Sequence, residues 1–306
     1  MNFKLKKSKL TYKKLKISDF DQFQNLFYLC FKKKISLNFF KWRYFSDKFS
    51  FCYGVFESSK LIANVGMVSI KLNNCKYERI FSRHSSMVLK EYRGLGIFSD
   101  LLKKVKTQIS KKTHLVIMWP NKNNFSNFSL NKNAIIKKKF YLYKTHSSIG
   151  KPKETKNYSI IQLYKFKKYI KSKDSLFFKD FIYFKNRYLS YNKNEYLINK
   201  YENKKNISFF IIKINKENTD LNHVILDHFG SESIRRKHLL ILIREKKKLV
   251  FLSKKKITRY NYKLLSYLNL KIGFIKKFTL EQKKTILKNR EIFLGDTDIF
   301  ITTRKI

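Results

Sequence analysis

The sequence predicts an α+β (α/β) protein with two tandem lobes, each built on a mixed central sheet flanked by helices. The chain has 306 residues, about twice the ~150 of a typical single domain. Strand-like and helix-like apolar patterns alternate along it, and 43% of its residues are hydrophobic, which allows a sizeable core. The order of these patterns starts again after a short polar segment, which indicates an internal duplication.

The first half opens with a basic lead-in over residues 1–16, followed by two helical segments. Ser18 is placed to cap the first helix, with Asp21 three residues further on. The side chains expected on the buried face of this helix are Phe20, Phe23, Phe27, Cys30 and Phe31. Residues 36–44 form the second helical segment.

The elements expected next are strands at residues 53–57, 61–72 and 79–89, a glycine-bearing loop, a helix, a strand at 113–119, a Lys-rich helix and a strand from residue 140. The helix after the loop has one continuous apolar stripe, whose members are Phe98, Leu101, Leu102, Val105 and Ile109. Alternation of strands and helices of these lengths favours a mixed sheet covered by helices.

The best candidate for a linker is the segment 147–157, which holds one of the two prolines and has no apolar periodicity. It divides the chain into a first lobe over 1–146 and a second lobe over 158–306. Phe40-Lys-Trp-Arg-Tyr-Phe-Ser46 has an echo in Phe184-Lys-Asn-Arg-Tyr-Leu-Ser190, with five identities in seven at an offset of 184 − 40 = 144. The elements that follow each copy occur in the same order, which favours duplication.

The charge of the chain has two explanations. The sequence carries 69 Lys and Arg against 21 Asp and Glu, a formal net charge of +48, which is typical of proteins that bind nucleic acid. Lys, Asn, Ile, Phe and Tyr also have A/T-rich codons, so an A/T-rich coding sequence would raise the lysine content without selection for a polyanion. Lys outnumbers Arg and is spread through both halves, so we expect nucleic acid not to be the partner.

Composition argues against three other classes. The apolar runs are far shorter than the ~20 residues of a membrane-spanning helix. The basic N-terminus lacks the apolar core of a signal peptide. Three cysteines cannot build a disulfide framework and have no metal-ligand spacing, so we expect no metal and a reduced, cytoplasmic protein.

The loop Arg93-Gly-Leu-Gly-Ile-Phe98 carries the clearest chemistry. Gly94 and Gly96 let the backbone approach a ligand closely. The amides around them enter the N-terminus of a helix, where unpaired N–H groups and a partial positive charge bind phosphate. Two glycines alone would fit an ordinary β–α turn equally well, so the context of the loop decides the interpretation.

In that context the loop resembles the acetyl-CoA loop of the GNAT acyltransferase superfamily, whose pattern is Arg/Gln-x-x-Gly-x-Gly/Ala after a strand. Phe98 departs from the small last residue of that pattern. Trp42-Arg-Tyr44 upstream and Pro120-Asn121 downstream resemble one tandem-lobe subgroup of this superfamily. The resemblance implies an N-acetyltransferase that uses acetyl-CoA as co-substrate, with a degenerate second lobe that lacks the loop.

The resemblance also implies roles for the residues around the loop. Backbone groups of the strand before it should pair with the pantetheine arm, and amides of the loop should hold the pyrophosphate, with the arginine supporting the loop. The cofactor-binding residues expected on this basis are Met87, Val88, Leu89, Arg93, Gly94, Leu95, Gly96, Ile97, Phe98 and Asn121.

The sequence singles out no strong catalytic acid or base. Arg83 occupies the position where the superfamily often has a glutamate base. His84 titrates near neutrality and is a candidate base, although strand alternation points it to the opposite face, as expected of a core or surface histidine. Glu78 is a further candidate base or a solvated loop carboxylate, and Tyr141 is the candidate acid.

The expected acceptor is a small-molecule primary amine. Ties of the subgroup to cell-surface sugars favour an amino sugar or its nucleotide in surface polysaccharide synthesis, and a basic surface would attract a phosphate-bearing acceptor. Antibiotic, polyamine, peptide and protein amines stay open. The cleft residues expected to contact the acceptor are Trp42, Arg43, Arg187 and Tyr188. Two other functions stay open: a basic nucleic-acid-binding protein, and an inactive CoA-binding pseudoenzyme, which Phe98 and the missing base favour.

Overall fold

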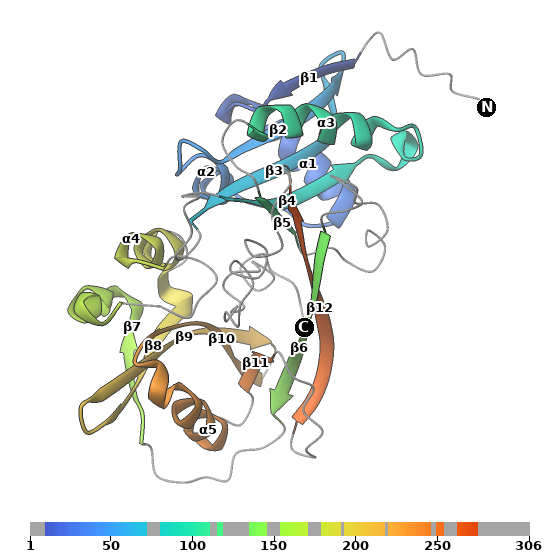
Figure 1. Ribbon diagram of the computed structural model, residues 1–306. Helices are drawn as coiled ribbons and strands as arrows, with labels where there is room; N and C mark the ends of the chain where they lie inside the picture. Colours follow the sequence, from blue (N-terminus) through green and yellow to red (C-terminus); the bar gives the residue numbers. More distant parts are fainter. Residues whose placement is uncertain are drawn as a thin grey trace.

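One continuous sheet runs through both halves of the chain (Figure 1). The computed structural model describes residues 10–71, 80–110, 115–118, 135–145, 154–170, 179–190, 193–217, 220–245, 249–253 and 262–274. In these residues the sheet has 12 strands in the order β1-β2-β3-β4-β5-β12-β6-β11-β10-β9-β8-β7.

The elements fall into two groups that follow each other along the chain. Those of the first half are β1 (Leu10–Lys14), α1 (Phe20–Phe31), α2 (Leu37–Tyr44), β2 (Phe51–Glu57), β3 (Lys60–Ile70), β4 (Ile80–Val88), α3 (Ile97–Ser110), β5 (Leu115–Met118) and β6 (Ile135–Thr145). Those of the second half are β7 (Lys156–Ser159), a 3-10 helix (Ile160–Tyr169), α4 (Phe181–Phe184), a π-helical turn (Lys185–Leu189), β8 (Tyr196–Asn203), β9 (Asn206–Glu217), β10 (Asp220–Gly230), α5 (Arg235–Glu245), β11 (Leu249–Ser253) and β12 (Tyr262–Phe274).

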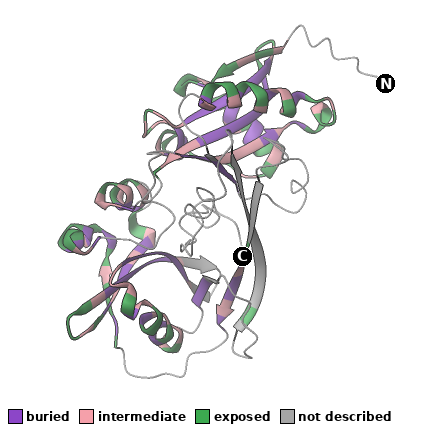
Figure 2. Cartoon of the chain, viewed as in Figure 1, coloured by how far each residue is buried: buried purple, intermediate pink, exposed green. Residues whose placement is uncertain are grey.

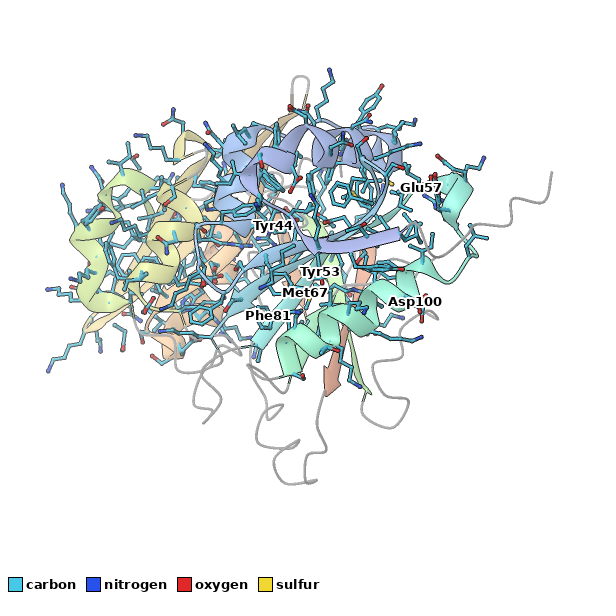
Figure 3. All side chains as sticks on the ribbon, turned by 90° about the horizontal axis from the view of Figure 1, so that it is seen from above. Tyr44, Tyr53, Glu57, Met67, Phe81 and Asp100 are labelled. Carbon is cyan, nitrogen blue, oxygen red and sulfur yellow. The ribbon has the colours of Figure 1, made fainter. Side chains whose placement is uncertain are left out.

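Helices cover both faces of the first-lobe strands. α1 and α2 pack on one face and α3 on the other, so Tyr44 and Asp100 lie on opposite sides of the sheet in Figure 3. The fully buried side chains of α3 are Ile97, Leu101, Val105 and Ile109, while Phe98 and Leu102 pack at the margin of the same core. The predicted apolar stripe of this helix is therefore confirmed. Figure 2 shows buried strands between helices whose outer faces are exposed.

α1 begins later than the sequence predicts. Ser18 lies inside a preceding 3-10 turn, and the helix starts at Phe20 without a side-chain cap. The turn is closed instead by the carboxylate of Asp19, which accepts a hydrogen bond from the amide of Lys16 at 2.7 Å. At its other end the helix stops before Lys32, which has a left-handed conformation. Phe31, the last residue of the helix, is 41% exposed and is not part of the core. Ser36 does cap α2.

The two halves exchange a strand at the centre of the sheet. β6 is the last strand of the first half but pairs antiparallel with β11 and β12, both from the second half. β12 in turn pairs antiparallel with β5 of the first half. Each half therefore completes its sheet with a strand from the other, and separating the halves would expose the edges of β5 and β11.

The arrangement on the two sides of the centre is the same. In each half one parallel pair, β4 with β5 and β10 with β11, joins otherwise antiparallel strands. The predicted two-lobe architecture of mixed sheets flanked by helices is confirmed.

The two copies of the seven-residue repeat contact each other. The indole N–H of Trp42 donates to the carbonyl of Asn186 at 2.6 Å, and these two residues are related by the offset of the repeat, 186 − 42 = 144. β7 begins inside the expected linker, at Lys156.

A buried polar network supports the second lobe. The hydroxyl of Ser208 lies 2.9 Å from Nε2 of His228 and 2.9 Å from Nδ1 of His238. The other ring nitrogen of His238 lies 2.7 Å from Oδ1 of Asn199. Burial lowers the pKa of His238 to about 3 and also lowers the pKa of His228. Both rings are therefore neutral near pH 7.

We expect the free energy of unfolding to fall as the pH drops from 7 to 5. His238 stays neutral in the folded protein down to pH 5 but takes up a proton on unfolding below its ordinary pKa of about 6.5, so its stabilising effect is complete above that pH and is lost as the pH falls further. His238 adds a slope of about 1.4 kcal/mol per pH unit, and the lowered pKa of His228 acts in the same direction. Urea unfolding across this range measures the slope, and His238→Gln should reduce it by one histidine's share. An unchanged slope in that variant would contradict the assignment.

Candidate functional site

The described pairing of β4 with β5 ends at Arg83 and Met118, so among the described residues the rest of β4 has one edge without a strand partner, called here the open edge. Parallel pairing joins residues 81–83 of β4 to residues 116–118 of β5. Beyond that point, and within the residues that the structure describes, β4 pairs with β3 alone. The amide of Leu89 donates to Ile62 of β3 at 2.9 Å, so the backbone groups of Val88 point the other way, toward the open edge. An extended ligand with amide groups can pair with β4 there.

A β-bulge interrupts β4 beside this edge. Two residues of β4, Ser85 and Ser86, lie opposite the single residue Val65 of β3. Ser85 takes a left-handed φ of 43°. The carbonyl of Ser85 accepts a hydrogen bond from Nδ2 of Asn64 at 3.1 Å. Its hydroxyl lies 2.5 Å from the hydroxyl of Tyr44. Two side chains thus hold the bulge in place, and bulges are frequent beside active sites.

Tyr44 reaches the bulge because Gly66 leaves room for its ring. A Cβ atom at Gly66 would lie 2.5 Å from Cε1 of Tyr44. Burial raises the pKa of Tyr44, so its hydroxyl stays protonated and can donate. This contact between Tyr44 and Gly66 was not predicted from the sequence, although a glycine inside a strand pattern is a signal that another group approaches the backbone closely.

The predicted glycine loop lies between the open edge and α3. Gly94 and Gly96 have φ values of +81° and +78°, which other residues adopt only with strain. Apart from the adjoining residues of the chain, no atom of the described part of the structure lies within 4 Å of the Cβ position of either glycine, so these residues leave the space above the loop open. Nε of Arg93 donates to the carbonyl of Val88 at 3.1 Å, which ties the loop to the end of β4.

Phe98 does not fill that open space. Its ring packs at the margin of the first-lobe core, and the guanidinium carbon of Arg83 lies 5.8 Å from the ring centroid. Burial lowers the pKa of Arg83 to about 10, so the side chain remains charged at neutral pH. Arg83 therefore lies on the α3 side of β4, opposite the face that carries His84.

Positive charge surrounds His84 where the two lobes meet. The guanidinium carbons of Arg43 and Arg187 lie 5.7 and 5.9 Å from the ring centroid of Trp42. Burial and the charge of Arg187 lower the pKa of Arg43 to about 9. Burial and the charges of Arg43, Arg187 and Arg83 hold the pKa of His84 well below 6.5. At neutral pH the imidazole is uncharged and the arginines are protonated.

A pocket of about 210 Å³ opens between the lobes beside these arginines. α2 and the end of β3 line it from the first lobe, and α4 with the π-helical turn lines it from the second. Trp42, Arg43 and Arg187 are among its lining residues, as the sequence analysis expected of the cleft. Tyr188 is fully buried behind it and donates to Oδ2 of Asp227 at 2.7 Å.

The second lobe has no equivalent of the glycine loop. A carboxylate occupies the corresponding place before α5: Oε2 of Glu232 lies 2.6 Å from Arg235, and Oε1 lies 3.3 Å from Nδ1 of His228. A negative charge at the N-terminus of this helix is stabilised by the helix dipole but would repel a bound phosphate. Only the first lobe carries an open glycine loop among the residues described.

The remaining predicted site residues are placed as follows. Glu78 and Asn121 lie outside the described residues. Tyr141 lies on β6 opposite Ser253 of β11 and packs against a second-lobe cluster that contains Leu242. The fold therefore gathers the end of β4, the glycine loop and His84 in one region, and it places Tyr141 with the other lobe.

No group of three or more His, Cys, Asp and Glu side chains in the described ranges is arranged to hold a metal ion. None of the helices in those ranges has the length and apolar character needed to cross a membrane.

Comparison with known proteins identifies relatives of this arrangement. Residues 11–127 match the family model of the acetyltransferase (GNAT) domain. A GCN5-related N-acetyltransferase from Anabaena variabilis superposes with a TM-score of 0.64 at 11% identity, over 87% of this chain and 73% of that one. A probable N-acyltransferase from Enterococcus faecalis gives 0.63 at 14% identity, over 92% and 74%. Eis1 from Mycobacterium abscessus gives 0.57 at 8% identity, over 87% and 73%. No curated protein sequence matches.

We expect Tyr44→Phe to lower the free energy of unfolding by about 1 kcal/mol, because the variant loses the hydrogen bond to Ser85. Tyr53→Phe is the matched control, since its hydroxyl makes a much longer contact of 3.5 Å with the carbonyl of Tyr12. Urea unfolding of both variants measures the difference. Equal losses would show that the Tyr44 hydroxyl does not hold the bulge.

Proposed function

We propose, taking residues 11–127 as a member of the GNAT superfamily, that this chain transfers an acetyl group from acetyl-CoA to a primary amine. The observation that carries the proposal is the continuity between the open edge of β4 and the glycine loop before α3. An ordinary β–α turn does not need two left-handed glycines in succession beside an unpaired strand edge. Members of this superfamily use acetyl-CoA as co-substrate.

The residues of this region fit acetyl-CoA in the donors they offer. The amide N–H of Val88 faces the open edge and suits a carbonyl group of a pantetheine arm, whereas its own carbonyl already accepts from Nε of Arg93 and from Sγ of Cys30. The amides that lead from Gly94 through Gly96 into α3 suit a pyrophosphate, which helix N-termini bind through unpaired N–H groups. Arg93 supports the loop through its hydrogen bond to Val88.

Acetyl-CoA supplies an acetyl group activated as a thioester. The protein's task is to bring a neutral amine to its carbonyl carbon and to stabilise the negative charge that develops on the carbonyl oxygen. The bulge fixed by Tyr44 and Asn64 leaves the ladder of β4 locally unpaired at this point. We assign it to the end of the open edge where the acetyl group would lie.

The positive charge of the nearby arginines would lower the pKa of the acceptor amine, so the amine can lose its proton without a strong base. Burial, together with the charges of Arg43, Arg187 and Arg83, lowers the pKa of His84 and keeps it in its neutral form. The same field disfavours an ammonium group beside them, so an amine bound there has a lowered pKa and is more often neutral. We assign His84 as the proton acceptor in this region: its imidazole is uncharged, and its low pKa requires it to pass the proton on.

The finer choice of acceptor is an amino sugar or its nucleotide, used in the synthesis of surface polysaccharide. The support for it is the pocket between the lobes, about 210 Å³ in volume and lined by both polar and aromatic side chains. A pocket of this size admits a small molecule better than a folded protein substrate.

We expect Gly96→Val to weaken acetyl-CoA binding by at least tenfold, since a branched side chain would enter the open space and strain a residue with φ of +78°. Lys32→Val is the matched control, because Lys32 is an exposed left-handed residue with φ of 55° at the end of α1. Isothermal titration calorimetry measures both affinities. Equal binding by the two variants would contradict the assignment of the loop.

We expect His84→Gln to lower the turnover number for acetyl transfer by about 10²-fold, at the lower end of general acid–base effects, with KM for acetyl-CoA unchanged. In the unaltered protein kcat/KM should show no inflection from His84 between pH 6 and 8, because its pKa lies well below 6.5. Thiol release measured across this range tests both points. Turnover equal to that of the unaltered protein would show that the amine loses its proton to water.

A further inference from the structure

The internal repeat brings two equivalent arginines to one pocket. Arg43 and Arg187 occupy the same position in the two seven-residue copies, 187 − 43 = 144. Both guanidinium groups lie within 6 Å of the ring of Trp42, and both side chains line the pocket between the lobes. The indole N–H of Trp42 is held by the carbonyl of Asn186, so this ring is fixed between the two copies.

The other charged side chains of the pocket are Lys71, Asp47 and Asp180. Each carboxylate accepts a hydrogen bond from a backbone amide two or three residues further along the chain. Oδ1 of Asp47 accepts from the amide of Phe49 at 2.7 Å, and Oδ1 of Asp180 accepts from the amide of Tyr183 at 2.7 Å at the start of α4. The pocket thus holds three cationic side chains and two carboxylates that serve as turn and helix caps.

We propose that Arg43 and Arg187 form an anion-binding subsite that spans the two lobes, and that the acceptor is an amine that also carries a phosphate or a carboxylate. This rests on the proposed acetyltransferase function. A guanidinium presents a planar fork that binds either anion through paired hydrogen bonds, and these bonds strengthen in a partly desolvated pocket. Arg43 is only 5% exposed, which meets that condition.

The position of the subsite matches the reaction. Arg43 immediately precedes Tyr44, whose hydroxyl contacts the β4 bulge, and its charge acts on His84 of the same strand. An acceptor anchored by its anion at the arginines therefore has its amine within reach of the bulge. The anion also offsets the repulsion between Arg43 and Arg187, which makes binding of a charged acceptor favourable.

The first test compares acceptors that differ only in their anion. Thiol release from acetyl-CoA is measured with a hexosamine phosphate against the unphosphorylated hexosamine, and with β-alanine against its amide. The anionic member of at least one pair should have a kcat/KM higher by roughly tenfold or more, and which pair responds distinguishes phosphate from carboxylate. Equal values within both pairs would overturn the proposal.

Variants test whether the arginines cause the preference for anionic acceptors. Arg187→Gln should reduce the ratio of anionic to neutral turnover about tenfold, and Arg187→Lys should restore part of it. Arg244→Gln is the matched control, since Arg244 is an exposed residue of α5 that does not line the pocket. A ratio that falls equally in Arg187→Gln and Arg244→Gln would overturn the assignment.

A binding measurement keeps the subsite testable even when no amine in the panel is acetylated. The chain has two tryptophans, so Trp119→Phe leaves Trp42 as the only indole reporter. With the loop saturated by CoA, inorganic phosphate or acetate should change its fluorescence saturably, and Arg187→Gln should abolish the change while Arg244→Gln keeps it. The same response in both variants contradicts the subsite. Absence of CoA binding instead contradicts the proposed function.

Discussion

The backbone pairing of β12 with β5 and β6 is the interaction on which the rest of the structure depends. β5 takes its second neighbour from the end of the second half, and β11 takes its second neighbour, β6, from the end of the first. Because each lobe is completed by the other, their relative position is set by main-chain hydrogen bonds and not by a flexible linker. That rigidity lets one pocket be built from residues 144 positions apart, as the bond between Trp42 and Asn186 shows.

The two lobes differ in the groups that they offer to a ligand. The first keeps a glycine loop with open space above it, whereas the second places Glu232 at the equivalent helix start. Each retains a buried tyrosine that contacts the bulged strand: Tyr44 meets Ser85, and Tyr188 meets Asp227, which also pairs with buried Lys179. In the second lobe an ion pair therefore lies beside the bulged strand, at the place that corresponds to the proposed acetyl site of the first lobe. The second lobe contributes instead to the pocket, through Arg187.

The local elements could be predicted from the sequence because their signals are local. The apolar stripe of α3 and the positive φ values at the glycine loop both follow from nearest neighbours. The strand exchange could not be predicted, since the apolar pattern of β6 is the same whichever lobe it joins. The environment of His84 could not be predicted either. Burial lowers the pKa of His84, and the charge of Arg187, a residue of the other lobe, lowers it further. Ser18 was a wrong cap because Asp19 competes for the same turn.

The central claim is that one duplicated chain makes one active site, with acetyl-CoA bound by the first lobe and the acceptor held between the lobes. The stoichiometry of acetyl-CoA binding tests this claim most directly. Calorimetric titration of the full chain should give one site per chain, and Gly96→Val should remove it while Lys32→Val, the exposed control at the end of α1, leaves it at one. Two sites per chain, or a single site that survives Gly96→Val, would contradict the account.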